Sequence, residues 1–418
     1  MTRKALLITA VAVATLVTAP AAGAHSVPGV DSCNPLQPSV PPGAISTSPN
    51  VEHLGWVPGE AGDMTAGGRK VGKYFYITGV SHFSIYDVST PESPKLVSRT
   101  EMPCRFENED VAVTPDGRYL MFSDFATSGS LYVYDVSDKA RPRQIADVAG
   151  AGTHTTTCVL KCTYLFGSYQ RIGSSGPLSN SVLVDLRDPA APKALGDWTA
   201  DGVLPSRKVH DVTEVAPGIL VTASAPIQVL DARKDPLKPT VIARGPDPTK
   251  RYHSVDWPRG GKDKFILADF ETNATQRCEL GAGDFSVFDA SEIGRKPGVT
   301  DFKRVSSWYP SNGTFSDGNP TANFGLGCSP HWFDVRPSWK DGGIVAVGAY
   351  DHGTKFLRVD GSGAITEAGH FLAPGTNASG AYWITCDIVY TVDYTRGLDV
   401  MRFTDEASAC KPDGGAED

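Results

Sequence analysis

Short runs of alternating apolar and polar residues, separated by turns rich in Gly, Pro and Asp, make up most of this 418-residue chain. Alternation with a period of two is typical of β-strands with one buried face. The 43 Gly and 31 Pro residues argue against long helices, and 40% hydrophobic residues suffice for a large buried core. We therefore expect a folded all-β protein.

One phrase recurs along the chain. Alternating apolar residues lead to an Asp, a short polar turn follows, and a Pro with an apolar residue begins the next run. The copies are SIYDVSTPESPKLV (84–97), YVYDVSDKARPRQI (132–145), VLVDLRDPAAPKAL (182–195), QVLDARKDPLKPTVI (228–242) and SVFDASEIGRKPGV (286–299). Each Asp is expected to cap its turn by accepting a hydrogen bond from the backbone N–H two residues on.

Two more apolar runs precede each copy, so a repeat contains four strands, which is typical of a propeller blade. The units begin near residues 63, 108, 153, 209, 252, 330 and 378, and they predict a seven-bladed β-propeller over residues 51–405. The last unit lacks an outer strand. Residues 51–58, VEHLGWVP, resemble an outer strand, and we expect them to complete the last blade and close the ring.

The first 24 residues predict a secretory signal peptide, with Arg3 and Lys4 before an apolar stretch and small residues at Ala22 to Ala24. The mature protein is thus expected to be secreted, with a flexible arm at 25–50, a disordered tail at 406–418 and no membrane span. Without Arg3 and Lys4, 37 basic residues face 47 acidic ones, a net charge of about −10. This balance disfavours nucleic acid and anionic membranes as partners. We expect a small-molecule substrate or an extracellular partner, and a monomeric chain.

Eight cysteines follow the signal segment, an even number that predicts disulfide bonds in an oxidising compartment. Cys158 and Cys162 flank a tight turn and are expected to staple one hairpin. The repeat suggests three further pairs: Cys278 with Cys328, Cys386 with Cys410, and Cys33 with Cys104.

The recurring phrase resembles the LVIVD repeat, a propeller-forming repeat of exported bacterial proteins. The resemblance rests on an alternating apolar run that ends in Asp, followed by a turn that contains Pro, and it covers most of residues 50–405. It implies the propeller fold and says little about activity, because a fold does not determine chemistry.

Four of the nine histidines hold one position in the repeat, at the start of the first strand of blades 3 to 6: His154, His210, His253 and His331. The first strand of a blade lines the central channel, so four imidazoles are expected to converge there. The same place in blade 2 holds Asn108 or Glu109. Imidazole suits Fe, Cu, Zn and Ni, and Glu109 can complete the site as an acid. Asp211 is expected to point away from the histidines.

The arrangement resembles that of two enzyme groups. Carotenoid-cleaving oxygenases hold iron on four histidines at the axis of a seven-bladed propeller, and selenium-binding proteins, which include methanethiol oxidases, have channel histidines implicated in copper chemistry. The likeness is one of architecture, without matching sequence motifs. Neither activity therefore carries over residue by residue. If the site is catalytic, we expect a metal-dependent oxidoreductase that activates O₂ or water.

Two alternatives stay open at this point. A repeated His can be a structural residue that bonds a backbone carbonyl, and the propeller can be a non-enzymatic binding or scaffold module.

The remaining histidines are expected to have other roles: His53, His82, His352 and His370 are expected to be surface or packing residues, and His25 would begin the mature chain. Insertions at 169–181 and 271–327 interrupt the repeat, and the second is expected to fold over the channel as a lid. We find no serine-hydrolase elbow, zinc-protease helix, EF-hand, Walker loop or dinucleotide fingerprint.

Overall fold

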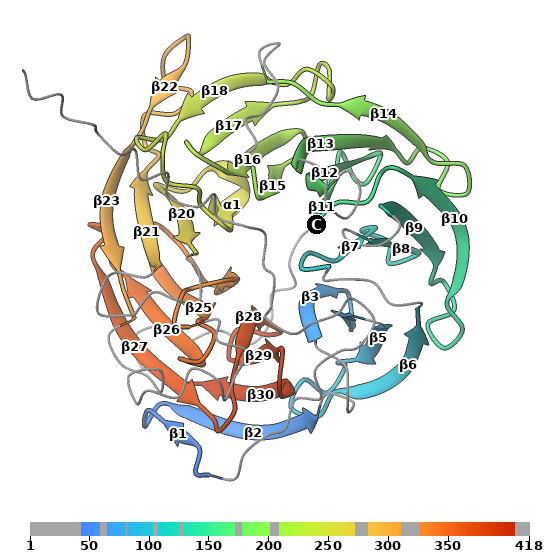
Figure 1. Ribbon diagram of the computed structural model, residues 1–418. Coiled ribbons are helices and arrows are strands. Elements are labelled where there is room, and N and C mark those ends of the chain that lie inside the picture. Colours follow the sequence, from blue (N-terminus) through green and yellow to red (C-terminus); the bar gives the residue numbers. More distant parts are fainter. Residues whose placement is uncertain are drawn as a thin grey trace, which may run out of the picture.

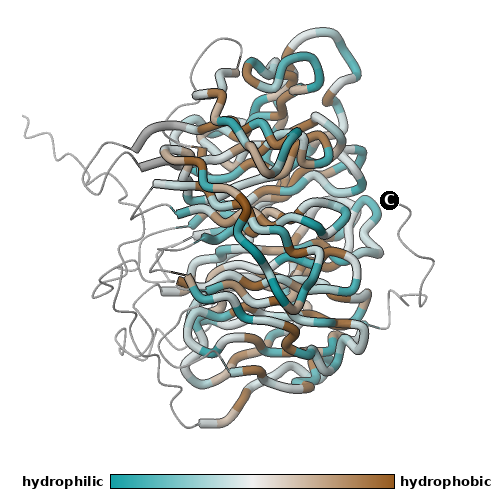
Figure 2. Tube along the Cα trace, turned by 90° about the vertical axis from the view of Figure 1, so that its right-hand side faces the viewer, coloured by the Kyte–Doolittle hydropathy of each residue, from teal (hydrophilic) through white to brown (hydrophobic). Residues whose placement is uncertain are grey.

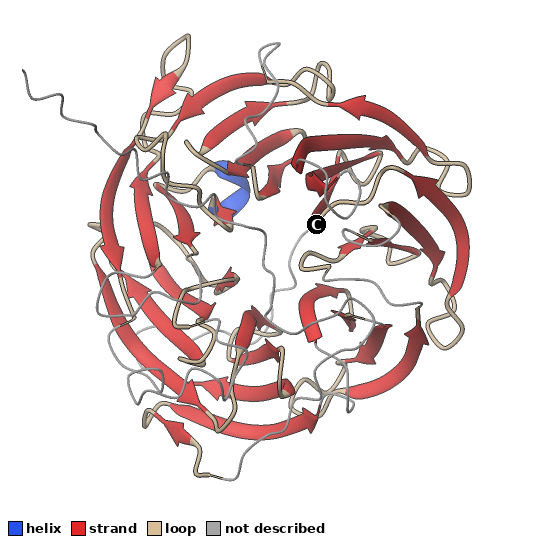
Figure 3. Cartoon of the chain, in the orientation of Figure 1, coloured by secondary structure: helices blue, strands red, loops and turns tan. Residues whose placement is uncertain are grey.

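The computed structural model describes residues 43–58, 65–80, 82–102, 108–124, 129–171, 178–200, 209–271, 283–310 and 327–405. Seven sheets stand in a ring around a central channel, so the protein is an all-β, seven-bladed β-propeller, as the repeat predicts (Figure 1). In the described part of the chain a single short helix, α1 (Pro258–Gly261), interrupts blade 5 (Figure 3).

The first three blades each contain four antiparallel strands that follow chain order from the channel outward. Blade 1 contains β3 (Thr65–Val71), β4 (Tyr74–Gly79), β5 (His82–Asp87) and β6 (Lys95–Glu101). Blade 2 contains β7 (Ala112–Val113), β8 (Tyr119–Ser123), β9 (Ser130–Asp135) and β10 (Arg143–Ala149). Blade 3 contains β11 (Thr155–Val159), β12 (Tyr164–Arg171), β13 (Leu178–Asp185) and β14 (Lys193–Asp197).

Blades 4 and 5 follow the same plan, except that one short strand from the blade 5 segment joins the sheet of blade 4. Blade 4 contains β15 (Asp211–Ala216), β16 (Ile219–Ala223), β17 (Gln228–Asp231) and β18 (Thr240–Arg244). Blade 5 contains β19 (Val255–Asp256), β20 (Phe265–Phe270), β21 (Asp284–Asp289) and β23 (Lys303–Trp308). The short strand β22 (Thr300–Asp301) pairs in parallel with β18 and covers the outer edge of blade 4.

The last two blades borrow their outermost strands from the N-terminal part of the chain. Blade 6 contains β24 (Phe333–Val335), β25 (Gly343–Gly348), β26 (Thr354–Val359) and β27 (Ile365–Leu372). Blade 7 contains β28 (Ala378–Trp383), β29 (Ile388–Asp393) and β30 (Gly397–Phe403). β2 (Val51–Pro58) pairs antiparallel with β30, which confirms the predicted ring closure.

A second N-terminal strand was not foreseen. Residues 46 and 47, placed by the sequence analysis in the flexible arm 25–50, form β1 (Ser46–Thr47), which pairs with β27 as a fifth strand of blade 6. The N–H of Ser48 also donates to the carbonyl of His370 at 3.1 Å. The N-terminal segment therefore crosses the junction between the last two blades and holds both of their outer edges.

The hydrophobic core is divided into seven clusters, and each cluster is shared by two neighbouring blades. At the closure, Phe75 and Ile77 of β4 in blade 1 pack with Tyr390 and Val392 of β29 in blade 7. Figure 2 shows apolar residues interleaved with polar ones through the stacked blades. Full burial of one such side chain contributes about 1.5–3 kcal/mol, so each blade is stabilised mainly by its neighbours.

The predicted Asp caps are present in all five copies of the phrase. Oδ1 of each Asp accepts a hydrogen bond from the backbone N–H two residues on, at 2.8–3.0 Å; the residues are Asp87, Asp135, Asp185, Asp231 and Asp289. The side chain thereby fixes the turn between the third and fourth strands of the blade. This explains why the repeat keeps an Asp at that place.

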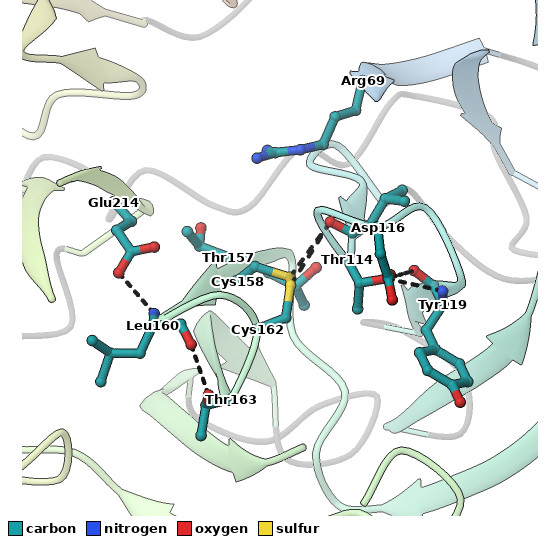
Figure 4. The surroundings of a disulfide bond; sticks show 12 residues. Arg69, Thr114, Asp116, Tyr119, Thr157, Cys158, Leu160, Cys162, Thr163 and Glu214 are labelled. Carbon is teal, nitrogen blue, oxygen red and sulfur yellow. Dashed lines mark hydrogen bonds between the residues drawn. A yellow bond between two sulfur atoms is a disulfide. The ribbon is translucent and has the colours of Figure 1, made fainter. Parts of the chain in front are cut away.

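Cys158 and Cys162 form the predicted disulfide, across the turn between β11 and β12 (Figure 4). Glu214 of the neighbouring blade accepts a hydrogen bond from the N–H of Leu160 in this turn at 2.7 Å. Cys328 and Cys386 are disulfide-bonded as well. The other four cysteines lie outside the described residues: Cys33, Cys104, Cys278 and Cys410. The three further predicted pairs each include at least one of them and therefore stay predictions.

The two predicted insertions are not single loops. Within the range 271–327, β21 and β23 belong to blade 5 and β22 joins the edge of blade 4, and β12 and β13 extend into the range 169–181. The copy of the repeat at 286–299 itself lies inside the second range, so the strands of blade 5 continue through it. The remainder of the predicted lid, the signal peptide 1–24 and the tail 406–418 lie outside the described residues. Within the part of the chain that is described, no helix is long and apolar enough to cross a membrane.

Candidate metal centre

Four histidines stand at equivalent places at the start of the innermost strand in blades 3 to 6. The backbone N–H of each donates to a carbonyl of the second strand in the same blade, at 2.8–3.1 Å. This repeated bond gives the four side chains the same starting direction, toward the channel. All four are at most 1% exposed: His154, His210, His253 and His331. The predicted convergence of these imidazoles is thus present in the fold.

The carboxylate of Glu109 lies in the middle of these imidazoles. Its Oε2 atom lies 3.2 Å from Nε2 of His154, 3.6 Å from Nε2 of His210 and 3.3 Å from Nε2 of His253. Its Oε1 atom lies 3.1 Å from Nε2 of His331. Five side chains from five consecutive blades therefore meet at one point on the channel axis.

The uncertain register in blade 2 is settled in favour of Glu109. The side chain of Asn108 stays in its own blade, where Oδ1 accepts a hydrogen bond from the N–H of Ser123 at 2.7 Å and Nδ2 donates to the carbonyl of Asp110. Glu109 instead reaches the axis, and its side chain is fully buried.

The second ring nitrogen of three histidines is used to connect neighbouring blades. Nδ1 of His210 bonds the carbonyl of His253 at 2.9 Å, Nδ1 of His253 bonds that of His331 at 3.1 Å, and Nδ1 of His331 bonds that of Ser379 at 2.8 Å. A carbonyl oxygen only accepts, so each Nδ1 carries the hydrogen. In the neutral ring the lone pair is then on Nε2, directed at the axis.

The protonation states inside the cluster are set by burial and by mutual charge. Burial, reinforced by His253 and His154, holds the pKa of His210 well below its usual range. Burial and the neighbouring His331 lower the pKa of His253 to about 4. For Glu109, burial acts to raise the pKa, but the charges of His154 and His331 outweigh it and hold the pKa well below its usual range. At neutral pH an ionised carboxylate therefore faces neutral imidazoles at His210 and His253.

This donor set fits a transition-metal ion. A carboxylate and an imidazole lone pair repel each other in a buried site unless a proton or a metal cation lies between them. Glu109 with His154 and His210, and Glu109 with His253 and His331, form two groups whose ligand atoms lie within 4.8 Å of one another and can hold a metal ion. Nitrogen donors with one carboxylate suit iron, copper and zinc.

Aromatic and acidic residues that the sequence analysis missed surround the cluster. The hydroxyl of Tyr394 donates to Oε1 of Glu109 at 3.3 Å. The ring of Tyr350 lies against that of His331, with centroids 4.7 Å apart, and its hydroxyl donates to Glu271. Oε2 of Glu271 lies 3.8 Å from Nε2 of His253. Their only sequence signal is their position near strand ends of blades 5 to 7, which does not distinguish them from other residues.

Tyr350 has a positive φ of 40°, which is uncommon for a residue other than Gly. Two backbone hydrogen bonds with Ala378 hold it there, at 3.1 and 2.9 Å. Strain of this kind is commonly kept at functional sites. The backbone therefore fixes the tyrosine ring over His331.

The other described histidines belong to packing and edge contacts. His53 on β2 lies 2.9 Å from Asp399 through Nε2 and stacks on Phe371. His370 lies on β27, and Nδ1 of His352 bonds Asp351 at 2.7 Å. His82 begins β5 and is buried. His25 lies outside the described residues.

A cavity of about 670 Å³ reaches Glu109 along the innermost strands. It extends to the turns after those strands, at Gly72, Pro115 and Lys161. Asp211 lines this cavity and is absent from the two groups of potential metal ligands, in agreement with its predicted direction. The cavity joins the buried cluster to one end of the channel.

Comparison with known proteins adds no assignment. No protein-family model matches the chain, and no curated protein matches it. The resemblance to the LVIVD repeat and the likeness to oxygenase and oxidase propellers therefore stay predictions. The functional argument rests on the geometry of the site itself.

Proposed function

We propose that this protein is an exported propeller of the LVIVD type that binds one transition-metal ion and acts as a metal-dependent oxidoreductase on a small molecule. The metal ligands are His154, His210, His253 and His331, and Glu109 is the acid beside them. The single observation that carries the proposal is the convergence of four Nε2 atoms, each within 3.6 Å of an oxygen of Glu109.

The residues of the chain prepare this site in three ways. The bonds from Nδ1 to the carbonyls of the next blade fix the ring orientation and leave Nε2 for the metal. Glu109 supplies one negative charge that offsets the charge of a bound cation, and Tyr394 holds its Oε1. Full burial keeps bulk water away and strengthens these electrostatic interactions. Bound iron or copper would supply redox chemistry with O₂, and bound zinc would supply a Lewis acid.

Metal content tests the proposal directly. The full chain would be produced with its export signal in medium supplemented with iron, copper and zinc, and metal would be measured by mass spectrometry. We expect about one metal ion per chain in the wild type and less than a tenth of that in the double variant His210→Ala, His253→Ala. The matched control, His53→Ala with His370→Ala on the outer strands, should keep the wild-type content. Negligible metal in wild type and double variant alike would overturn the proposal.

A second candidate function has one observation in its favour. The Nδ1 bonds link blades 4 to 7 whether or not a metal is bound, so the histidines stabilise the ring by themselves. A propeller that holds an extracellular partner needs no more than this. The metal measurement separates the two, because the scaffold function predicts a metal-free wild-type protein.

A further inference from the structure

The channel cavity next to the proposed metal site is lined by more acidic than basic side chains. Asp110, Asp211, Asp256, Asp334 and Glu214 line the cavity of about 670 Å³ that reaches Glu109. The basic residues of the lining, Arg69, Lys70 and Lys161, are exposed on the surface. Arg69 approaches one acid, with Nη1 3.9 Å from Oδ1 of Asp110. The interior of the channel is therefore an environment for a cation.

One of these carboxylates, Asp211, has an oxygen atom that can accept a hydrogen bond from a ligand. Asp211 is 2% exposed, and within the described part of the chain its Oδ1 atom has no hydrogen-bond partner. An unsatisfied buried carboxylate oxygen is costly, and a donor from a bound molecule would remove this cost. Because Asp211 lines the cavity, such a donor would reach it from the channel.

The shape of the cluster favours an organic cation over a metal ion. Among the described residues, no three of the channel carboxylates offer oxygens within 4.8 Å of one another, so they cannot chelate one small ion. Four aromatic residues line the same cavity: Trp332, Phe333, Tyr382 and Trp383. Aromatic faces attract organic cations and pack on their methylene groups. The volume is that of a small-molecule site.

Trp332 connects the channel with the metal centre. It lines the cavity, and its ring meets that of His253 edge-on, with centroids 5.2 Å apart. Glu109 also lines this cavity. A molecule held by the channel acids therefore lies next to the proposed metal ligands.

We propose that this channel binds an aliphatic primary amine, with its ammonium group on Asp211 and the neighbouring carboxylates and its carbon chain against the aromatic wall. An ammonium group donates up to three hydrogen bonds and so can satisfy more than one acid. This inference names the substrate class of the metal centre and rests on the proposed function for the chemistry, but not for binding.

Two channel acids, Asp256 and Asp334, have raised pKa values. Burial, with the nearby Asp334, raises the pKa of Asp256 to about 7. Burial also raises the pKa of Asp334 to about 6. A bound ammonium group would favour the ionised form of both and offset part of the cost of their burial.

Calorimetric titration with 1,5-diaminopentane at pH 8 and low ionic strength tests the inference. We expect one molecule per chain, bound at least tenfold more tightly than the neutral 1,5-pentanediol, and no binding of the dianion glutarate. Asp256→Asn should weaken diamine binding at least fivefold, whereas Asp188→Asn, in an exposed turn, should not change it. Thermal unfolding of both variants verifies that they are folded.

Three results would overturn the inference: equal binding of diamine and diol, unchanged binding in Asp256→Asn, or displacement of the diamine by equimolar CaCl₂, which would indicate an inorganic cation site. The titration is repeated with the metal-free His210→Ala, His253→Ala variant. If the wild type binds the diamine but contains no metal, the proposed function alone is refuted. If the wild type contains metal but does not bind the diamine, this inference alone is refuted.

Discussion

Nε2 of His331 lies 3.1 Å from Oε1 of Glu109, although 222 residues separate the two in the chain. Only the closed ring brings the start of blade 6 to the start of blade 2. The contact is buried from solvent and is one of four similar approaches to the same carboxylate. The proposed metal site is thus assembled by the whole fold, and its properties can be tested one residue at a time.

Replacement of Glu109 by Gln keeps the volume of the side chain and removes its charge. We expect metal affinity to fall about 10- to 100-fold, because the cation loses the carboxylate that offsets its charge. Competition with a chelator measures the affinity. Tyr394→Phe, which removes one hydrogen bond to Oε1, should have a smaller effect, and Glu367→Gln on the outer strand β27 should have none. Unchanged affinity in Glu109→Gln would exclude a role of the carboxylate in metal binding.

The two ring nitrogens of His210 can be separated by substitution. Asn places an amide N–H near the position of Nδ1, so His210→Asn is expected to keep the bond to the carbonyl of His253 and to lose the metal donor Nε2. We expect a loss of metal with a free energy of unfolding within about 1 kcal/mol of the metal-free wild type. His210→Ala, which loses both, should be less stable than His210→Asn. Equal metal content in wild type and His210→Asn would assign this histidine a structural role alone.

The pKa of His253 predicts how stability depends on pH in the metal-free protein. Burial and His331 lower this pKa to about 4, from 6.5 in the unfolded chain. The folded state thus binds this proton less readily, and the stabilisation present above pH 6.5 is lost as the pH falls toward 4. The full effect is on the order of 3 kcal/mol.

Urea unfolding at pH 7.5 and pH 4.5 measures this dependence. We expect His253→Gln to reduce the difference in the free energy of unfolding between the two pH values by about 2 kcal/mol. His370→Gln, on the half-buried outer strand β27, should retain most of the wild-type difference. If His253→Gln keeps the wild-type difference in the free energy of unfolding between the two pH values, other groups cause the loss of stability at low pH.

The fold could be predicted from the sequence because its signal repeats. Asp87 and its four equivalents end a strand at the same place in each unit, and the structure shows each capping its turn. The closing strand 51–58 was recognisable because it resembles an outer strand whose position in blade 7 was vacant. β1 was missed because two residues carry no periodic pattern.

The histidines of the centre could be predicted for the same reason, since each occupies one register of the repeat. Glu109 was left as one of two residues, because a shift by one position reverses the direction of a side chain on a strand. Tyr350, Tyr394 and Glu271 could not be found, since their contacts with His331, Glu109 and His253 depend on blade packing and on a positive φ at Tyr350. Such contacts leave no periodic trace in the sequence.

The N-terminal strands give a last prediction, on the stability of the ring. Seven residue pairs join β2 to β30, and the indole of Trp56 donates to the carbonyl of Arg396 at 2.7 Å. A chain that begins at residue 59 exposes the edge of β30 and the cluster at the junction of blades 1 and 7. We expect it to aggregate or to unfold at least 15 °C below a chain that begins at residue 43, in a thermal melt. A chain that begins at residue 49 loses β1 and the bond from Ser48 to His370 but keeps β2, and it should unfold only a few degrees lower, because β1 contributes only two residue pairs. Equal melting temperatures for the chains that begin at 43 and 59 would mean that the ring is held closed by the inner strands without β2.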